Sequence, residues 1–184
     1  LAGPTTTLTQ SSCDAALVVD PNSVGYFRVQ YDTASFNALS GQVAGLPDTT
    51  RFKLLSDTWS MVQAGRQDLG SYLNLVSGYS DEPRLAVWAS ILTNLGTLDR
   101  LAQGEPEQKL IRRYLVKVVK PRFSKLGWDE RPSDTIEDKQ MRAMMAASLA
   151  RAGDPEAIAQ ARARFARFLA DPSSVSPAMI DFTL

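Results

Sequence analysis

The apolar residues of this chain change their spacing at residues 31–32, and this change constrains the fold more than any other sequence feature. Before it, apolar and aromatic residues form short runs of the kind found in β-strands. After it, apolar residues recur every three or four positions, which is typical of helices that bury one face. The sequence therefore predicts a mainly α protein with a short β-type region at its start and a domain boundary between residues 31 and 32.

Two strand-like runs lie before that boundary. Residues 16–19 are apolar, residues 26–31 are aromatic and β-branched, and the turn-forming residues 20–25 separate them. This arrangement predicts a β-hairpin, and the Thr-rich residues 5–10 are compatible with an edge strand. Because an isolated hairpin is only marginally stable in water, we expect these strands to belong to a sheet that lies mostly outside this chain.

Seven helices and the beginning of another are expected between residues 32 and 184. Four of the starts share a polar residue followed by proline, which is tolerated there because the first helical N–H has no intrahelical partner. These starts are Glu82-Pro83, Glu105-Pro106, Asp154-Pro155 and Ser176-Pro177. Short connections make successive helices antiparallel neighbours, so we expect an irregular HEAT/ARM-like α-solenoid without a clean repeat. The last six residues resemble the start of an element, which predicts a helical domain truncated at its C-terminus.

The residue counts exclude many kinds of site. The chain has no histidine, so it lacks an imidazole base, a Ser-His or Cys-His couple and a His-ligated zinc ion. The single cysteine, Cys13, excludes an intrachain disulfide and a CxxC zinc site. No apolar run approaches the roughly 18–20 residues of a membrane span. The sequence therefore predicts no catalytic residue, no metal site and no cofactor within this chain.

Five carboxylates gather between residues 129 and 138, namely Asp129, Glu130, Asp134, Glu137 and Asp138. Four oxygen donors could hold calcium, but the EF-hand spacing with its obligatory glycine is absent. Asp134 and Glu137 have instead the spacing of a capping box, in which two side chains satisfy backbone N–H groups at a helix start. A polar loop followed by an acidic helix start is therefore the favoured interpretation.

The strongest charge feature is a run of seven basic residues without an intervening acid. Its members are Lys109, Arg112, Arg113, Lys117, Lys120, Arg122 and Lys125. At about 100° per residue the first five share one face of a helix, and apolar side chains take the opposite face. Two interpretations stay open: a solvated helix face, or a site for an anion such as a peptide carboxylate or an acidic partner. Nucleic acid is disfavoured, because 20 basic residues balance 20 acidic ones and no base-stacking aromatic residues are interleaved.

Residues 25–32, Gly-Tyr-Phe-Arg-Val-Gln-Tyr-Asp, form the most specific stretch of the chain. They closely resemble the Gly-Tyr-Tyr-Arg-Val-Asn-Tyr-Asp signature of the zinc-dependent aminopeptidases related to aminopeptidase N and puromycin-sensitive aminopeptidase. The matching positions, to which the resemblance gives a structural role, are Gly25, Tyr26, Arg28, Tyr31 and Asp32. Three later segments resemble elements of the same family in the same order: residues 51–59, residues 69–75, and residues 126–129 with Met141-Arg142.

The resemblance implies a domain arrangement. In the family the signature ends a β-sandwich domain and leads into a C-terminal helical domain. Residues 1–31 are therefore expected to be the incomplete tail of the sandwich, and residues 32–184 the helical solenoid domain. The family's His-Glu-x-x-His helix, distal Glu ligand and Gly-Ala-Met-Glu-Asn motif lie upstream and have no counterpart here. Zinc is expected in a catalytic domain outside this chain, and the fragment alone is expected to be inactive.

The function that the resemblance implies is indirect. In the family the helical domain covers the active site and shapes the substrate chamber, so its partners are the peptide substrate and the catalytic domain of the same polypeptide. The far end of a peptide carries an anionic carboxylate, and the expected contacts are Lys109, Arg113, Lys117 and Lys120. The alternative is a free-standing α-helical repeat module for protein–protein interaction, against which the orphaned strands at the start argue.

Overall fold

The computed structural model describes residue 7 and residues 16–183. These residues form eight α-helices and three short 3-10 turns, and no β-strand occurs among them. The α-helices are α1 (Thr33–Gly41), α2 (Asp48–Gln63), α3 (Leu69–Ser77), α4 (Leu85–Leu101), α5 (Glu107–Leu126), α6 (Ile136–Arg151), α7 (Pro155–Ala170) and α8 (Ile180–Thr183). The 3-10 turns are η1 (Val43–Gly45), η2 (Pro172–Ser174) and η3 (Pro177–Met179). The prediction of a mainly α protein is therefore confirmed.

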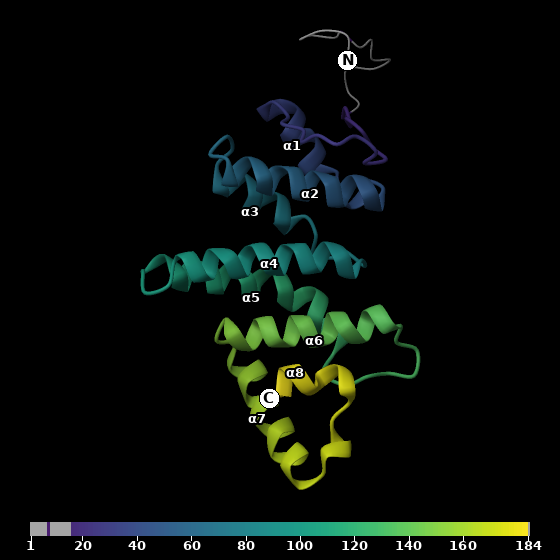
Figure 1. Ribbon diagram of the computed structural model, residues 1–184, viewed down its shortest axis with the longest axis vertical. Coiled ribbons are helices and arrows are strands. Elements are labelled where there is room, and N and C mark those ends of the chain that lie inside the picture. The colour runs from purple at the N-terminus through teal and green to yellow at the C-terminus, as the bar shows by residue number, and fades with distance from the viewer. Residues whose placement is uncertain (1–6, 8–15, 184) are drawn as a thin grey trace.

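The helices are stacked in chain order along the longest axis of the molecule, with α1 near one end and α7 and α8 at the other (Figure 1). Helices α2, α4 and α6 lie one above another, with α3 beside α2 and α5 beside α4. The contacts follow this order: α2 packs against α3 and α4, α4 against α5 and α6, and α6 against α7 and α8. Each helix therefore contacts mainly its near neighbours in the chain.

One apolar core runs through the stack. Its largest fully buried apolar side chains include Leu55, Tyr72, Leu75, Trp88, Ile91, Leu95, Met141, Met145 and Leu149. Complete burial of one large apolar side chain contributes about 1.5–3 kcal/mol. Packing of these faces, more than intrinsic helix propensity, therefore stabilises the stack.

Local capping explains where two of the predicted helices begin. Asp32 accepts a hydrogen bond from the Ser35 N–H (2.9 Å) before α1, and Asp154 accepts one from the Ala157 N–H (2.9 Å) before α7. Pro155 occupies the first position of α7, as predicted. Each bond satisfies one of the N–H groups that a first helical turn leaves without a partner.

The predicted helix start at Glu82-Pro83 is wrong, because the Glu82 carboxylate is used elsewhere. Helix α4 begins at Leu85. Glu82 instead accepts hydrogen bonds from Arg51 Nε (2.5 Å) and Arg51 Nη2 (3.0 Å), both on α2. Its Oε1 also accepts the Arg84 N–H (2.9 Å), a backbone group just before Leu85, rather than an N–H of the first turn of α4.

The other proline positions differ only slightly from the prediction. Helix α5 begins at Glu107, with Pro106 as its N-cap, and it continues through Pro121 to Leu126. Pro177 opens the turn η3, and α8 follows directly.

The predicted β-hairpin is not formed in the described residues, and residues 16–31 contain no strand. The Val19 N–H donates to the Tyr31 hydroxyl (3.1 Å), and the Val29 N–H donates to the Asp57 carboxylate of α2 (3.1 Å). Side chains thus bind backbone N–H groups that would otherwise form hydrogen bonds between two strands. In addition, two strands without a neighbouring sheet are only marginally stable in water. The predicted edge strand at residues 5–10 lies outside the described residues except for Thr7.

Candidate functional site

The signature segment, residues 25–32, is bound to helix α2 through one buried carboxylate. Arg28 Nη1 donates to Asp57 Oδ1 (3.0 Å), and the Val29 N–H donates to Asp57 Oδ2 (3.1 Å). Lys53 Nζ lies 3.0 Å from Asp57 Oδ2 and also donates to the Phe27 carbonyl (3.2 Å). The Asp57 side chain is only 2% exposed, and two cations and one N–H compensate its buried charge. This contact is a physical reason for the signature and the 51–59 segment to occur in one chain.

Tyr31 and Asp32 of the signature also hold the segment in place, whereas the Tyr26 side chain is fully exposed. The Tyr31 hydroxyl accepts a hydrogen bond from the Val19 N–H, and Asp32 caps α1. The Ser35 N–H and hydroxyl hold the pKa of the Asp32 carboxyl below its usual value. A Cβ on Gly25 would lie 2.1 Å from the Phe27 ring, so a larger residue there would displace the ring.

Four exposed apolar side chains form what we call the aromatic patch: Val24 just before the signature, Tyr26 and Phe27 within it, and Phe52 on α2. Val24 is 84% exposed and Tyr26 is fully exposed. The Asp20 carboxylate accepts the N–H groups of Val24 (3.0 Å) and Gly25 (3.1 Å), so the loop is held in place. Asp20 and Ser23 both have φ of 55°, a conformation that is costly without glycine and is found at functional sites.

Helix α5 carries all four basic residues that the sequence assigned to a carboxylate contact, and the structure separates them into two groups. Lys109, Arg113 and Lys117 are exposed and form no ion pair with any residue of the described part. Lys120 Nζ lies 2.9 Å from Asp154 Oδ2 and 3.3 Å from Glu156 Oε2, at the start of α7. The hydrogen bond to Asp154 raises the pKa of Lys120. Lys120 thus joins α5 to α7, while the other three stay available to an anion.

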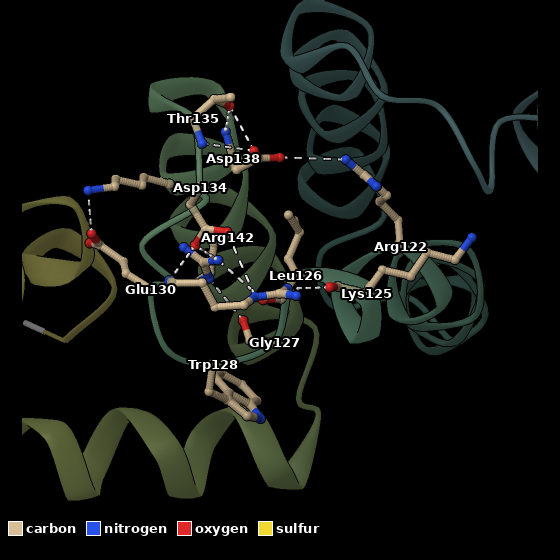
Figure 2. Close-up of polar contacts among 12 residues, drawn as sticks. Arg122, Lys125, Leu126, Gly127, Trp128, Glu130, Asp134, Thr135, Asp138 and Arg142 are labelled. Atoms are coloured by element: carbon tan, nitrogen blue, oxygen red, sulfur yellow. Dashed lines mark hydrogen bonds and ion pairs between the residues drawn. The ribbon is translucent and has the colours of Figure 1, made fainter.

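The loop between α5 and α6 is built around the buried side chain of Arg142 (Figure 2). Its Nε donates to the Gly127 carbonyl (3.1 Å), and its Nη2 donates to the Leu126 carbonyl (3.2 Å) and to Asp134 Oδ2 (2.5 Å). The two carbonyls lie at the C-terminal end of α5, where a helix leaves acceptors without partners. The two segments that resemble the family, at 126–129 and 141–142, are therefore in direct contact.

The capping box of α6 lies one residue later than predicted (Figure 2). Thr135 Oγ1 accepts the Asp138 N–H (3.1 Å), and Asp138 Oδ2 accepts the Thr135 N–H (3.0 Å). The predicted box of Asp134 and Glu137 is wrong because Asp134 accepts from Arg142 instead.

The carboxylate cluster between residues 129 and 138 is largely neutralised by basic side chains. Four of its five members form ion pairs, which are Asp129–Arg164, Glu130–Lys139, Asp134–Arg142 and Asp138–Arg122. Across residues 7 and 16–183, no three His, Cys, Asp or Glu side chains lie close enough together to hold a metal ion. Over the same ranges, no helix is both long enough and apolar enough to cross a membrane.

Sequence reasoning did not find the ion pairs that fix these segments. Arg51 and Glu82 join α2 to the turn before α4, and their side chains are 10% and 1% exposed. In the same way, Asp57 binds the signature segment, and Arg142 binds the loop between α5 and α6. Arg51, Asp57 and Arg142 all lie in segments that resemble the aminopeptidase family, and that position is the one signal that singles them out in the sequence.

Comparison with known proteins places this arrangement in a family. Residues 16–183 match the ERAP1-like C-terminal domain. Aminopeptidase 2 of Candida albicans is 28% identical over 93% of this chain, and Aminopeptidase M1-A of Oryza sativa subsp. japonica is 28% identical over 88% of it. Glutamyl aminopeptidase of Homo sapiens is 25% identical over 91% of the chain. The matched regions are 19%, 19% and 18% of these relatives, so the chain spans about a fifth of their length.

The matched region contains the signature segment with its contacts to α2, the loop around Arg142 and the whole helical stack. The chain therefore belongs to the ERAP1-like C-terminal domain family.

Proposed function

We propose that this chain is the non-catalytic C-terminal helical domain of a zinc metallo-aminopeptidase that removes N-terminal residues from peptides. The observation that carries this proposal is the family match over residues 16–183, to relatives that are named aminopeptidases and are much longer than the chain. In this proposal residues 1–31 end a β-sandwich domain and residues 32–184 belong to an irregular HEAT/ARM-like α-solenoid. The stacking of helices in chain order supports the solenoid (Figure 1).

The zinc ion of such an enzyme would lie outside this chain. The residues present do not fit it, because the sequence has no histidine and no donor cluster forms in the described part. We therefore derive no chemical step from this chain. Its proposed role is to cover the active site of a catalytic domain in the same polypeptide and to shape the chamber that receives the peptide.

The aromatic patch is the proposed contact with the preceding domains. Three of its four residues, Val24, Tyr26 and Phe27, belong to residues 1–31, which in this proposal end the β-sandwich domain, and Phe52 extends the patch onto α2. Aromatic side chains contribute large buried areas to interfaces, and contiguous exposed apolar surface is typical of a surface that a partner covers. The hydrogen bonds of Asp20 hold the patch in one conformation, which lowers the entropic cost of docking.

The exposed basic face of α5 is the proposed contact with the carboxylate of a bound peptide. Lys109, Arg113 and Lys117 have no carboxylate partner among the described residues, so an incoming carboxylate displaces none. Lys120 would take part only by giving up Asp154 and Glu156, and it is therefore a secondary contact.

The experiment compares the longer polypeptide that contains this chain with a variant carrying Lys109→Glu, Arg113→Glu and Lys117→Glu. A matched control reverses three other exposed basic residues, Arg66, Arg162 and Arg167. For the first variant the proposal predicts a higher KM for peptides and a changed preference for peptide length. For the control it predicts no change in either quantity. Equal KM and equal length preference in all three proteins contradict the carboxylate contact. Hydrolysis with unchanged rate and selectivity after deletion of residues 16–183 contradicts the covering role itself.

A further inference from the structure

Two adjoining hollows lie near the edge of the stack at which α4 and α6 end and α5 begins (Figure 1). The first, of about 310 Å³, lies between α4, α5 and α6, and the second, of about 450 Å³, lies between α5 and the turn from α6 to α7. Arg112 and Ala152 line both hollows and form the wall between them. We propose that a compact polyanion carrying several phosphate groups binds across this wall.

The side chains around the two hollows are strongly cationic. Arg100 and Arg151 line the first hollow, Lys109 and Arg113 line the second, and Arg112 lines both. Apart from Arg112, none of these five side chains forms an ion pair with a residue in the described part of the chain. Four cations from three helices thus lie around the same small region of the surface.

The two acids that line the hollows are already bound. Asp99 accepts two hydrogen bonds from Arg112, of 2.6 Å and 3.2 Å, and Asp154 accepts one from Lys120 (2.9 Å). The glutamates within residues 105–107 precede the cations of α5 but line neither hollow. The charge of the four cations is therefore left to an anion from outside.

Helix stability explains only half of this arrangement. Arg100 and Arg151 lie in the last turns of α4 and α6, where the helix dipole stabilises a cation. Lys109 lies in the first turn of α5, where the same dipole disfavours a cation. Arg113 follows four residues later, and like charges at this spacing destabilise a helix. A bound anion would compensate the repulsion between Lys109 and Arg113, which nothing in α5 itself compensates.

The spread of these cations favours a ligand with more than one anionic group. A carboxylate binds one guanidinium through two parallel hydrogen bonds. Lys109 and Arg113 are separated by about 6 Å along α5, at about 1.5 Å per residue, and Arg100 and Arg151 lie on two other helices. One carboxylate would therefore leave most of the four charges uncompensated.

Phosphate is the anionic group that fits these side chains best. Three of the four uncompensated cations are arginines, whose guanidinium fork binds phosphate oxygens bidentately. A phosphate monoester carries about −1.5 to −2 charges and three acceptor oxygens. Among the described residues that line the two hollows none is aromatic, so a nucleotide base would find no stacking partner. These features favour a phosphate-rich ligand without a base, such as an inositol polyphosphate.

The inference goes beyond the proposed function and is tested without it, by calorimetry on this chain. The probe is inositol hexakisphosphate, and the comparison is citrate, which carries carboxylates only. We expect the hexakisphosphate to bind at least about tenfold more tightly than citrate, and its affinity to fall with added salt. Vesicles with phosphatidylinositol bisphosphate, compared with phosphatidylserine vesicles, show whether the phosphates belong to a lipid headgroup. Binding of the hexakisphosphate alone supports a free ligand, and preferential binding of the phosphoinositide vesicles supports a headgroup.

Two pairs of substitutions locate the site on both sides of the wall. Arg100→Gln with Arg151→Gln removes the cations of the first hollow, and Lys109→Gln with Arg113→Gln removes those of the second. We expect each pair to weaken binding of the hexakisphosphate by about tenfold or more. Arg100 and Arg151 take no part in the proposed peptide contact, so their replacement should leave KM for peptides unchanged in the longer polypeptide. Loss of polyphosphate binding thus stays distinguishable from loss of the peptide contact.

A matched control removes two exposed arginines of α7 that line neither hollow. Arg162→Gln with Arg167→Gln changes the net charge by the same amount and should leave the affinity unchanged within about twofold. Thermal melts establish that each variant is folded. Three results overturn the inference: no binding of the hexakisphosphate or of phosphoinositide vesicles, equal binding of the hexakisphosphate and citrate, or equal weakening by the control pair.

Discussion

Replacement of Glu82 by glutamine should destabilise this domain strongly, because Glu82 compensates a buried arginine. Its carboxylate accepts hydrogen bonds from Arg51 Nε (2.5 Å), from Arg51 Nη2 (3.0 Å) and from the Arg84 N–H (2.9 Å). The glutamine side chain has the same shape but no charge, and its NH2 group would face a guanidinium that has only donors. Arg51 would then remain 10% exposed without its main counterion.

The magnitude follows from the burial of the pair. Removal of one partner from a buried ion pair costs about 3–5 kcal/mol. The lower end applies here, because Asp48 Oδ1 still lies 2.9 Å from Arg51 Nη2. A loss of about 3 kcal/mol corresponds to a decrease in Tm of roughly 6–12 °C for a chain of this size.

Urea unfolding followed by circular dichroism measures this loss, and the neighbouring residue supplies the control. Asp81 pairs with Lys125, but both side chains are more than half exposed, so Asp81→Asn should leave the urea midpoint almost unchanged. Arg51→Met combined with Glu82→Leu should recover much of the stability, because no buried charge then remains uncompensated. Equal losses for Glu82→Gln and Asp81→Asn, or a double variant less stable than Glu82→Gln, would refute the reasoning.

Three further predictions concern single residues. Gly96→Ala should raise the free energy of unfolding by about 0.5–1 kcal/mol, since the added Cβ meets open space inside α4; a lower urea midpoint would show that this space is filled. Asp154→Ala should cost about 1–2 kcal/mol at pH 7, since the cap of α7 is lost. Burial alone would raise the Asp154 pKa, but the Ala157 N–H and Lys120 lower it below its usual 3.8. The stability that Asp154 contributes is therefore present above pH 3.8 and is lost as the pH falls through the lower pKa of the folded state. At that low pH the urea midpoints of the unchanged protein and of Asp154→Ala should converge. Tyr26→Ser should change stability by less than about 0.5 kcal/mol, because the side chain is fully exposed, and should reduce binding of an apolar dye.

The sequence predicted those helix starts whose partners lie within one turn. Asp32 binds the Ser35 N–H and Asp154 binds the Ala157 N–H, three residues along the chain in each case. The start of α4 at Leu85 was not predicted, because the Glu82 carboxylate binds Arg51, 31 residues away in sequence, and the N–H of Arg84 rather than an N–H of the first turn of α4. A local pattern shows which side chains are able to cap a helix, but not which distant partners they also bind.

The candidate site shows the same division between local and distant contacts. The spacing of basic and apolar residues correctly placed Lys109, Arg113 and Lys117 on the exposed side of α5. It did not reveal that Lys120 binds Asp154, 34 residues later. The hairpin failed for a related reason, since the backbone N–H of a strand-like segment is bound by a carboxylate on α2.

The central claim is that this chain is the helical, non-catalytic part of a zinc aminopeptidase. The most direct measurement compares two purified proteins, this chain and the longer polypeptide encoded by the reading frame that contains it, for zinc content and for release of N-terminal residues from peptides. The account predicts that the longer polypeptide binds zinc and hydrolyses peptides, and that this chain does neither. Zinc-dependent hydrolysis by this chain alone would contradict the account, as would a reading frame that encodes no His-Glu-x-x-His motif upstream of Leu1.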